Sequence, residues 1–588
     1  MTSEHNKKLF SLRSKFQELG LDGYIIPRSD EYLGEYVPAC AERLAWISGF
    51  TGSAGLAIVL RNRACVFSDG RYTLQLEQQV DGSLWERRHL IEDKPEDWLR
   101  QVALGQKIGF DPWTISPDML ARFTGVEMHP VTPNLIDAIW ADRPAPPHAP
   151  ALPYPTDYAG ESAASKRQRL GTALKDAGQD AAILSDGASL AWLFNIRGSD
   201  LEFCPFALGY AILHQSGESE LFMAPEKITE ALRAHLGPDV KIATQKDLQT
   251  ALSRLKGKTI RYDPATMPVW FETSLRAAGA GIAQAPDIVA LPRACKNARE
   301  QAGSRAAHLR DAVAMVTFLS WLAEAAPTAQ ETEISAAERL LACRAVQSLF
   351  KGESFPAISG AGENGAIIHY RATPESHRQI KANEVYLIDS GGQYLDGTTD
   401  VTRTIWTGPD VAPAQIKAHA TRVLAGTIAL ARLVFPVGVA GAHLDAFARQ
   451  ELWRVGLDYD HGTGHGVGAY LSVHEGPVSL SRAAKPVALA EGMILSDEPG
   501  YYLPGAYGIR MENLLLVEKA NFPETKKQFL RFETLTLVPF DRALIEPSLL
   551  PVESLNWLNA YHARVRAALS PHLSGNVFDW LQKATEIL

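Results

Sequence analysis

The sequence has few cysteines, little excess charge and no long apolar run. Its net charge of −9 over 588 residues is mild, so we expect neither nucleic acid nor a membrane surface as its partner. No apolar run approaches the roughly 20 residues of a membrane span, and residues 1–8 lack the apolar core of a signal peptide. An odd, scattered set of cysteines predicts reduced thiols in a cytoplasmic protein, without a disulfide framework: Cys40, Cys65, Cys204, Cys295 and Cys343.

What is present is ordinary globular composition, with 46% hydrophobic and 21% charged residues. A chain of 588 residues should contain more than one core. Residues 144–155 are rich in proline and predict a stiff linker between domains. We predict three domains and a tail, with these boundaries: 1–143, 156–292, 293–549 and 550–588.

The first two predicted domains show signs of a duplication. Residues 3–19 have helical periodicity, Gly20 can end that helix, and residues 23–27 follow as a strand, which indicates an α/β domain. Two short matches, Trp46 with Trp192 and Gly52 with Gly198, share an offset of 146 residues. Matches this short can also arise by chance, so both explanations stay open.

An acidic stretch follows in the third domain. Residues 385–388 are apolar and β-prone, which predicts a buried strand, and Asp389 comes directly after them. A carboxylate at the end of a buried strand needs a charged partner, commonly a metal ion. A turn at residues 391–392 and a strand at residues 399–406 could bring Asp400 beside Asp389. Both could equally be turn aspartates.

A second acidic stretch favours the metal interpretation. Residues 493–496 predict a strand that ends before Glu498, and residues 508–517 predict one buried strand carrying Glu512. With His465 from a glycine-rich loop, the four carboxylates could hold two divalent ions with balanced charge. Oxygen-rich ligation suits hard ions such as manganese. Such a pair would lower the pKa of a shared water and polarise a carbonyl, which is metal-assisted hydrolysis.

The histidines do not match a zinc-protease helix. His461 and His465 have helical spacing, but the glycines between and after them favour a loop or strand. His474 and Glu475 begin like a metalloprotease motif, yet the second histidine is missing and Gly476-Pro477 follows. That motif is therefore rejected.

These motifs together resemble a known family. Six segments carry the resemblance: residues 368–370, 396–404, 461–468, 473–477, 497–502 and 508–513. They are similar to the long, three-domain Xaa-Pro aminopeptidases (aminopeptidase P) of the pita-bread metallopeptidases. The resemblance implies a multidomain α/β and α+β fold: two related α/β N-terminal domains, a C-terminal pita-bread metallopeptidase domain and a helical extension. It also implies a homodimer.

The resemblance implies roles for individual residues. Two divalent ions, expected to be Mn²⁺, would be bound by Asp389, Asp400, His465, Glu498 and Glu512. Glu498 and His461 would be catalytic, with His461 moving protons. Substrate would be contacted by His369, His461, His474, Tyr502, Arg510 and Arg71. Simpler alternatives stay open: hydrogen-bonded structural histidines, packing of Tyr502 and Arg510 around the ligands, and a surface position for Arg71.

The implied activity is release of the N-terminal residue from peptides with proline in second place, by a hydroxide bridging two metal ions. One alternative is a dipeptidase for Xaa-Pro (prolidase), against which the extra N-terminal domain and the tail argue. Another is a catalytically inactive pita-bread module that binds peptides. The presence of all five ligand residues argues against that module.

Overall fold

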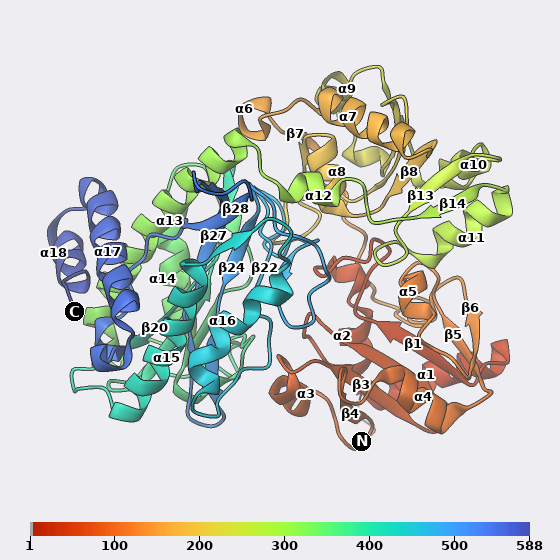
Figure 1. The fold of residues 1–588 in the computed structure, drawn as a ribbon. Helices are drawn as coiled ribbons and strands as arrows, with labels where there is room; N and C mark the ends of the chain where they lie inside the picture. The colour runs from red at the N-terminus through yellow and green to blue at the C-terminus, as the bar shows by residue number, and fades with distance from the viewer. Residues whose placement is uncertain (1–3) are drawn as a thin grey trace. The chain divides into compact units, whose positions relative to one another are not determined.

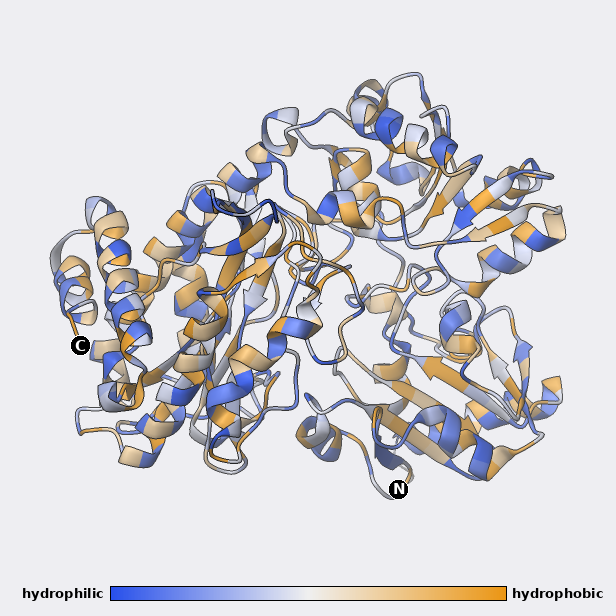
Figure 2. Cartoon of the chain, in the orientation of Figure 1, coloured by the Kyte–Doolittle hydropathy of each residue, from blue (hydrophilic) through white to orange (hydrophobic). Residues whose placement is uncertain are grey.

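The computed structural model describes residues 4–588, which form two compact units, residues 4–290 and 291–588 (Figure 1). Each unit has its own sheets and its own buried apolar clusters. Several strands are hydrophobic along their whole length, whereas helices mix hydrophobic and hydrophilic residues (Figure 2). That difference follows from strands buried on both faces and helices that bury one face only.

The first half of the N-terminal unit is a six-stranded mixed sheet with strand order β4-β3-β2-β1-β5-β6. Its strands are β1 (Gly23–Pro27), β2 (Leu56–Leu60), β3 (Ala64–Ser68), β4 (Glu86–His89), β5 (Lys107–Phe110) and β6 (Glu127–Pro130). Its helices are α1 (Glu4–Leu19), α2 (Arg43–Ser48), α3 (Thr73–Gln79), α4 (Pro95–Ala103) and α5 (Pro117–Leu120). Gly20 follows α1 with φ of 64°, the left-handed conformation that ends helices.

The second half repeats this topology, with strand order β12-β11-β10-β8-β13-β14. Its strands are β8 (Ala181–Leu184), β10 (Tyr210–His214), β11 (Ser219–Phe222), β12 (Val240–Ala243), β13 (Thr259–Tyr262) and β14 (Gly281–Gln284). Its helices are α6 (Thr156–Ala159), α7 (Ala163–Asp176), α8 (Gly187–Leu193), α9 (Glu230–Leu236), α10 (Leu248–Ser253) and α11 (Val269–Ala278), and α12 (Ala290–Ala294) follows.

Equivalent strand pairs in the two halves run in the same relative directions. The first strand is antiparallel to one neighbour and parallel to the other in both sheets. Trp46 lies in α2 and Trp192 in α8, each following the first strand of its sheet. The prediction of two related α/β domains is therefore confirmed. Their exact boundaries stay proposals, since β7 (Leu152–Pro153), at the end of the proline-rich segment, pairs with β9 (Ile196–Arg197).

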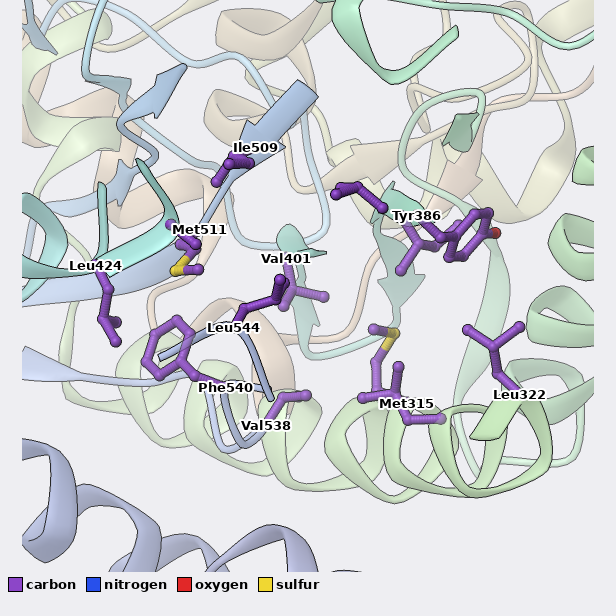
Figure 3. Close-up of a cluster of buried hydrophobic side chains, with 14 of the residues drawn as sticks. Met315, Leu322, Tyr386, Val401, Leu424, Ile509, Met511, Val538, Phe540 and Leu544 are labelled. Carbon is purple, nitrogen blue, oxygen red and sulfur yellow. The ribbon is translucent and has the colours of Figure 1, made fainter. Parts of the chain in front are cut away.

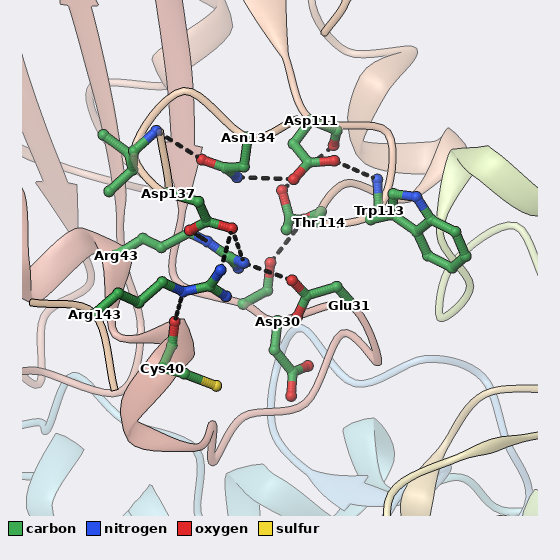
Figure 4. Close-up of polar contacts among 12 residues, drawn as sticks. Asp30, Glu31, Cys40, Arg43, Asp111, Trp113, Thr114, Asn134, Asp137 and Arg143 are labelled. Atoms are coloured by element: carbon green, nitrogen blue, oxygen red, sulfur yellow. Dashed lines mark hydrogen bonds and ion pairs between the residues drawn. The ribbon is translucent and has the colours of Figure 1, made fainter. Parts of the chain in front are cut away.

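A buried arginine cluster stabilises the first half of this unit (Figure 4). Arg43 is only 2% exposed and donates to Asp137 at 2.7 and 2.9 Å and to Glu31 at 2.5 Å. Arg143 also pairs with Asp137 at 2.8 Å and donates to the carbonyl of Cys40. Within this set of four side chains, two carboxylates face two guanidinium groups and the charges balance; Arg43 is the buried member, since Glu31 is 33% and Arg143 28% exposed.

The second unit contains several small antiparallel sheets. Its strands are β15 (Phe350–Glu353), β16 (Ile358–Ala361), β17 (Val385–Ser390), β18 (Gly392–Tyr394), β19 (Gly397–Thr398), β20 (Val401–Trp406), β21 (Val434–Pro436), β22 (Gly464–His465), β23 (Ser479–Leu480), β24 (Ile494–Asp497), β25 (Gly500–Leu503), β26 (Tyr507–Arg510), β27 (Asn513–Ala520) and β28 (Phe529–Thr534). Its long helices are α13 (Ala298–Ala325), α14 (Glu333–Ala345), α15 (Ala414–Ala431), α16 (Gly441–Trp453), α17 (Val552–Leu569) and α18 (Gly575–Ala584).

The long helices share one apolar core with β17 and β20 (Figure 3), and a second core lies against β21, β24, β27 and β28. Met315 of α13, Tyr386 of β17 and Leu424 of α15 are all fully buried in the first core. The C-terminal helices belong to the same core, because Leu558 of α17 and Leu581 of α18 are also fully buried there. The C-terminal extension is thus packed into the second unit and is not a loose appendage.

The structure corrects one predicted element. Residues 508–517 do not form one strand: β26 ends at Arg510, β27 begins at Asn513, and Glu512 lies between them. The five cysteines are free, four of them buried and Cys295 half-buried. Across residues 4–588, no helix is both long enough and apolar enough to span a membrane.

Candidate metal centre and active site

The first two predicted ligands lie at the same end of one strand pair. β17 and β20 are antiparallel, with Asp389 opposite Thr402, and Asp400 directly precedes β20. The connection between them contains the hairpin of β18 and β19 rather than a simple turn. A Cβ on Gly391 would collide with the carbonyl of Thr399, so glycine is required where the chain returns to Asp400.

The other two carboxylates come from a second pair of strands. β24 is antiparallel to β27, and Glu498 follows β24 directly. The amide of Glu512 donates to the carbonyl of Thr402 at 3.2 Å, which fastens the break between β26 and β27 to β20. This contact brings two chain segments more than 100 residues apart to one site.

His465 enters from the short strand β22. A Cβ on Gly464 would collide with the carbonyl of Ser496, and one on Gly466 with the carbonyl of Glu475. The glycines therefore permit close packing of backbones, and the histidine lies in a strand as the glycine spacing indicated. Its Nε2 lies 3.5 Å from Asp400 Oδ2 and 3.3 Å from Glu498 Oε1.

The orientation of His465 suits metal binding. Its Nδ1 lies 3.0 Å from the carbonyl of Gly466, to which it donates its hydrogen. Nε2 is then directed at the carboxylates, the position from which a neutral imidazole binds a metal. Asp400, His465 and Glu512 each offer a ligand atom, and these atoms lie within 4.8 Å of one another.

Two buried carboxylate oxygens of the predicted ligands have no hydrogen-bond partner among residues 4–588. They are Oδ1 of Asp389 and Oε1 of Glu512, in side chains 7% and 1% exposed. Buried carboxylate oxygens without partners cost free energy unless a cation or a proton satisfies them. The donor set and these oxygens fit divalent metal ions.

The pKa values of the carboxylates and of His465 also indicate an excess of negative charge at this site. Burial raises the pKa of Asp389 to about 7, although Arg510 opposes that rise. Burial also raises the pKa of Glu498, and it raises that of Glu512 well above the ordinary value, with help from Asp400. Burial lowers the pKa of His465, but Asp400 and Glu498 outweigh it and raise that pKa to about 9.

Arg510 is the guanidinium group at this site. It is 1% exposed, donates to Asp389 Oδ2 at 2.6 Å and to the hydroxyl of Tyr502 at 2.7 Å. That hydroxyl lies 2.9 Å from Nε2 of His461, whose Nδ1 lies 2.8 Å from the carbonyl of Gly462. A continuous hydrogen-bonded chain thus runs from Asp389 to His461.

The other predicted substrate contacts are His474, His369 and Arg71, and they lie in three different places. The ring of His474 packs edge-on against that of His465, with centroids 4.3 Å apart, so it adjoins the centre. His369 lies half-buried in a turn after the helix Gly362–Ala366. Arg71 lies in the N-terminal unit, where it forms an ion pair with Asp69 at 2.7 Å.

Two residues that support the site were not predicted. Thr402 donates its hydroxyl to Glu512 Oε2 at 2.7 Å, and Ser496 donates to Glu498 Oε1 at 2.9 Å. The hydroxyl of Ser496 also accepts from the amide of His465 at 3.0 Å. Strand alternation could have placed Thr402 on the same side as Asp400, but no local pattern marks Ser496.

Four family models match successive parts of the chain. Residues 8–139 and residues 142–300 match Creatinase/Prolidase N-terminal domains. Residues 302–519 match metallopeptidase family M24, and residues 528–588 match the C-terminal region of that peptidase. The second match to an N-terminal domain agrees with the repeated sheet topology.

Three relatives are similar over nearly the whole chain. Aminopeptidase P2 of Arabidopsis thaliana is 38% identical over 99% of this chain and 88% of its own. Xaa-Pro aminopeptidase 2 of Sus scrofa is 37% identical over 99% and 89%. The crystal structure of X-prolyl aminopeptidase from Caenorhabditis elegans, a cytosolic enzyme with a di-nuclear active site, superposes with a TM-score of 0.94, at 33% identity, over 99% of this chain and all of that one.

The similarity extends from end to end of the chain. It includes two creatinase-type domains and the acidic centre of the catalytic unit, so it shows more than a shared fold. The chain belongs to metallopeptidase family M24, among the long Xaa-Pro aminopeptidases.

Proposed function

We propose that this protein is a metal-dependent exopeptidase that releases the N-terminal residue from peptides with proline in second place. The observation that carries the proposal is the convergence of Asp400, His465 and Glu512 within 4.8 Å, in a chain similar from end to end to Xaa-Pro aminopeptidases. The Xaa-Pro bond is a tertiary amide without an N–H group, so peptidases that bind that N–H do not cleave it.

Two divalent ions, which we propose to be Mn²⁺, would be held by Asp389, Asp400, His465, Glu498 and Glu512. When bound there, they supply a water of lowered pKa and polarisation of the scissile carbonyl. The chemistry of the donors supports the choice of metal, because carboxylate oxygens favour hard ions.

Glu498 and His461 move the protons. The carboxylate of Glu498 is 17% exposed, so it borders both the buried centre and the space open to substrate, and we propose that it accepts a proton from the attacking water. His461 has its Nδ1 hydrogen on the Gly462 carbonyl, which leaves Nε2 to exchange a proton with the Tyr502 hydroxyl or with the departing proline nitrogen.

We propose substrate contacts for His369, His461 and His474. Tyr502 and Arg510 combine such a contact with a second task, because their hydrogen bonds also orient Asp389. Arg71 forms an ion pair with Asp69 in its own domain, and its contact with substrate stays a prediction from the family resemblance.

The closest rival is a dipeptidase for Xaa-Pro. Relatives named Xaa-Pro aminopeptidase cover 99% of the chain, including both N-terminal domains and the extension, which favours the aminopeptidase. The test compares three substrates: Ala-Pro-Ala, Ala-Pro and Ala-Ala-Ala. The proposal expects cleavage of the first with alanine released, little cleavage of the second and none of the third. Exclusive cleavage of Ala-Pro would establish the dipeptidase instead.

We further propose a homodimer in the cytoplasm, in keeping with the family resemblance and with free rather than bridged cysteines. Light scattering at working concentration tests the assembly, and a mass near 64.2 kDa would show a monomer and overturn it. Fractionation of the source cells tests the location.

A further inference from the structure

Arg403 of β20 is a fully buried cation with an unusual set of partners. It is 0% exposed and donates through Nη1 to the carbonyls of Glu512 at 2.5 Å and Thr402 at 2.8 Å. Further bonds go to the carbonyls of Pro539 and Val538, the side chain of Asn513 and the hydroxyl of Tyr561. None of these partners is a carboxylate, so the group is held entirely by dipoles, and burial lowers its pKa.

The backbone that Arg403 holds is the one that presents Glu512. Because Glu512 lies in the gap between β26 and β27, no sheet ladder fixes its carbonyl. Contacts from β20 replace the ladder: Thr402 binds the amide and the carboxylate of Glu512, while Arg403 binds its carbonyl. A shift of the guanidinium group would therefore move Glu512 directly.

The C-terminal extension reaches the same guanidinium group through Tyr561 of α17. The hydroxyl of Tyr561 accepts from Nη2 of Arg403 at 3.2 Å and lies 2.8 Å from the carbonyl of Val538. Tyr561 is 4% exposed, and the ring of Trp557 stacks on it in near-parallel orientation at 5.1 Å. The hydroxyl is thus locked in place by the helix that carries it.

We propose that the C-terminal extension positions the carboxylate of Glu512 through Tyr561 and Arg403, and so tunes metal affinity. This inference rests on the proposed function, since it takes Glu512 as a metal ligand. Tyr561 is a positioning residue: it contacts Arg403, and Arg403 in turn binds the carbonyl of Glu512. Loss of such outer hydrogen bonds typically costs about 10- to 100-fold in metal affinity.

The test uses the full chain with Tyr561→Phe, which removes only the hydroxyl. Mn²⁺ affinity is measured by equilibrium dialysis followed by metal analysis, without reference to activity. We expect affinity to fall about tenfold. In assays, kcat should fall at low Mn²⁺ and recover at saturating Mn²⁺, with KM for Ala-Pro-Ala unchanged. Thermal unfolding in chelator checks that the variant folds.

The matched control is Arg564→Met on the same helix. Arg564 donates to the carbonyl of Thr534 and so also ties α17 to the catalytic unit, but it has no bond to Arg403. We expect wild-type Mn²⁺ affinity. Equal loss in both variants, or wild-type affinity in Tyr561→Phe, would overturn the inference. A wild-type protein that binds no divalent ion would instead overturn the proposed function itself.

Discussion

The two units of this protein bury charge in opposite ways. In the N-terminal unit, Arg43 and Arg143 face Glu31 and Asp137, and each carboxylate has a guanidinium partner. In the catalytic unit, four carboxylates converge around one guanidinium group, that of Arg510, and one imidazole, that of His465. The first cluster is balanced by its own residues. The second has a surplus of negative charge that its residues do not balance.

The difference shows that the charge balance of a buried cluster indicates whether the cluster is structural or binds cations. A balanced cluster is consistent with a structural role, because each group satisfies another. A surplus of converging carboxylates is costly in a metal-free fold and is relieved when cations bind. Asp30 is an intermediate case, because it is a single buried carboxylate rather than a group of several. Its Oδ1 accepts from the amides of Tyr32 and Gly34, its Oδ2 lacks a partner among the described residues, and burial raises its pKa to about 7. A proton can satisfy a single such carboxylate.

The largest expected effect comes from removing the cations or one carboxylate of the acidic centre. Chelation should reduce hydrolysis to background, and Mn²⁺ should restore it best. Asp400→Asn should lose bound metal and activity together, because it removes one of the four charges that hold the ions. Metal content and turnover are measured together. The control is Asp396→Asn, since Asp396 pairs with Arg310 outside the centre. A fully loaded, active Asp400 variant would contradict the assignment.

Variants of His465 and His461 test which of the two histidines binds the metal ions. His465→Ala should lower both metal content and rate, because His465 Nε2 faces two of the carboxylates. His461→Ala should keep both metals, because its Nε2 faces Tyr502 instead. Loss of its proton transfer should lower kcat about 10²- to 10⁴-fold. Metal loss in the His461 variant, or near-normal turnover with both metals bound, would reverse the two roles.

Breaking the balanced cluster should affect stability and leave metal binding intact. Asp137→Asn removes the main partner of Arg43, which is 2% exposed and would stay charged. Leaving a buried charge without its partner should lower local stability by about 3 kcal/mol. Hydrogen exchange of amides in β1 and β2 of the full chain measures that loss. Unchanged exchange would show that Glu31 alone satisfies Arg43.

The smallest expected effect concerns Asp30 and depends on pH. Its pKa is raised in the folded state from 3.8 to about 7, so its contribution to stability is complete below pH 3.8 and is lost as pH rises through 7. Asp30→Asn should remove that dependence and stabilise this domain by about 2 kcal/mol at pH 8, a value below the full linkage effect because the new amide stays buried. Hydrogen exchange at pH 6 and pH 8 provides the comparison. A variant that keeps the wild-type slope would contradict it.

Much of the site was predictable because its donors sit beside strands with clear apolar patterns. The strands at residues 23–27 and 385–388 were predicted from short β-prone runs, and the structure has β1 and β17 there. The single strand predicted at residues 508–517 was wrong. Its apolar residues continue across Met511, but contacts from β20 interrupt the ladder at Glu512, and those contacts are more than 100 residues away in sequence.

By itself, the sequence determined the types and order of the candidate ligands and the glycines that let their backbones approach. These are local properties, carried by residue chemistry and periodicity. Only the tertiary structure decided that Asp389 pairs with Arg510, that Thr402 and Ser496 hold Glu512 and Glu498, and that Tyr561 reaches Arg403. Pairing and burial depend on which distant segments share one core. They set the surplus of charge at one cluster and its balance at the other, and no local pattern encodes that difference.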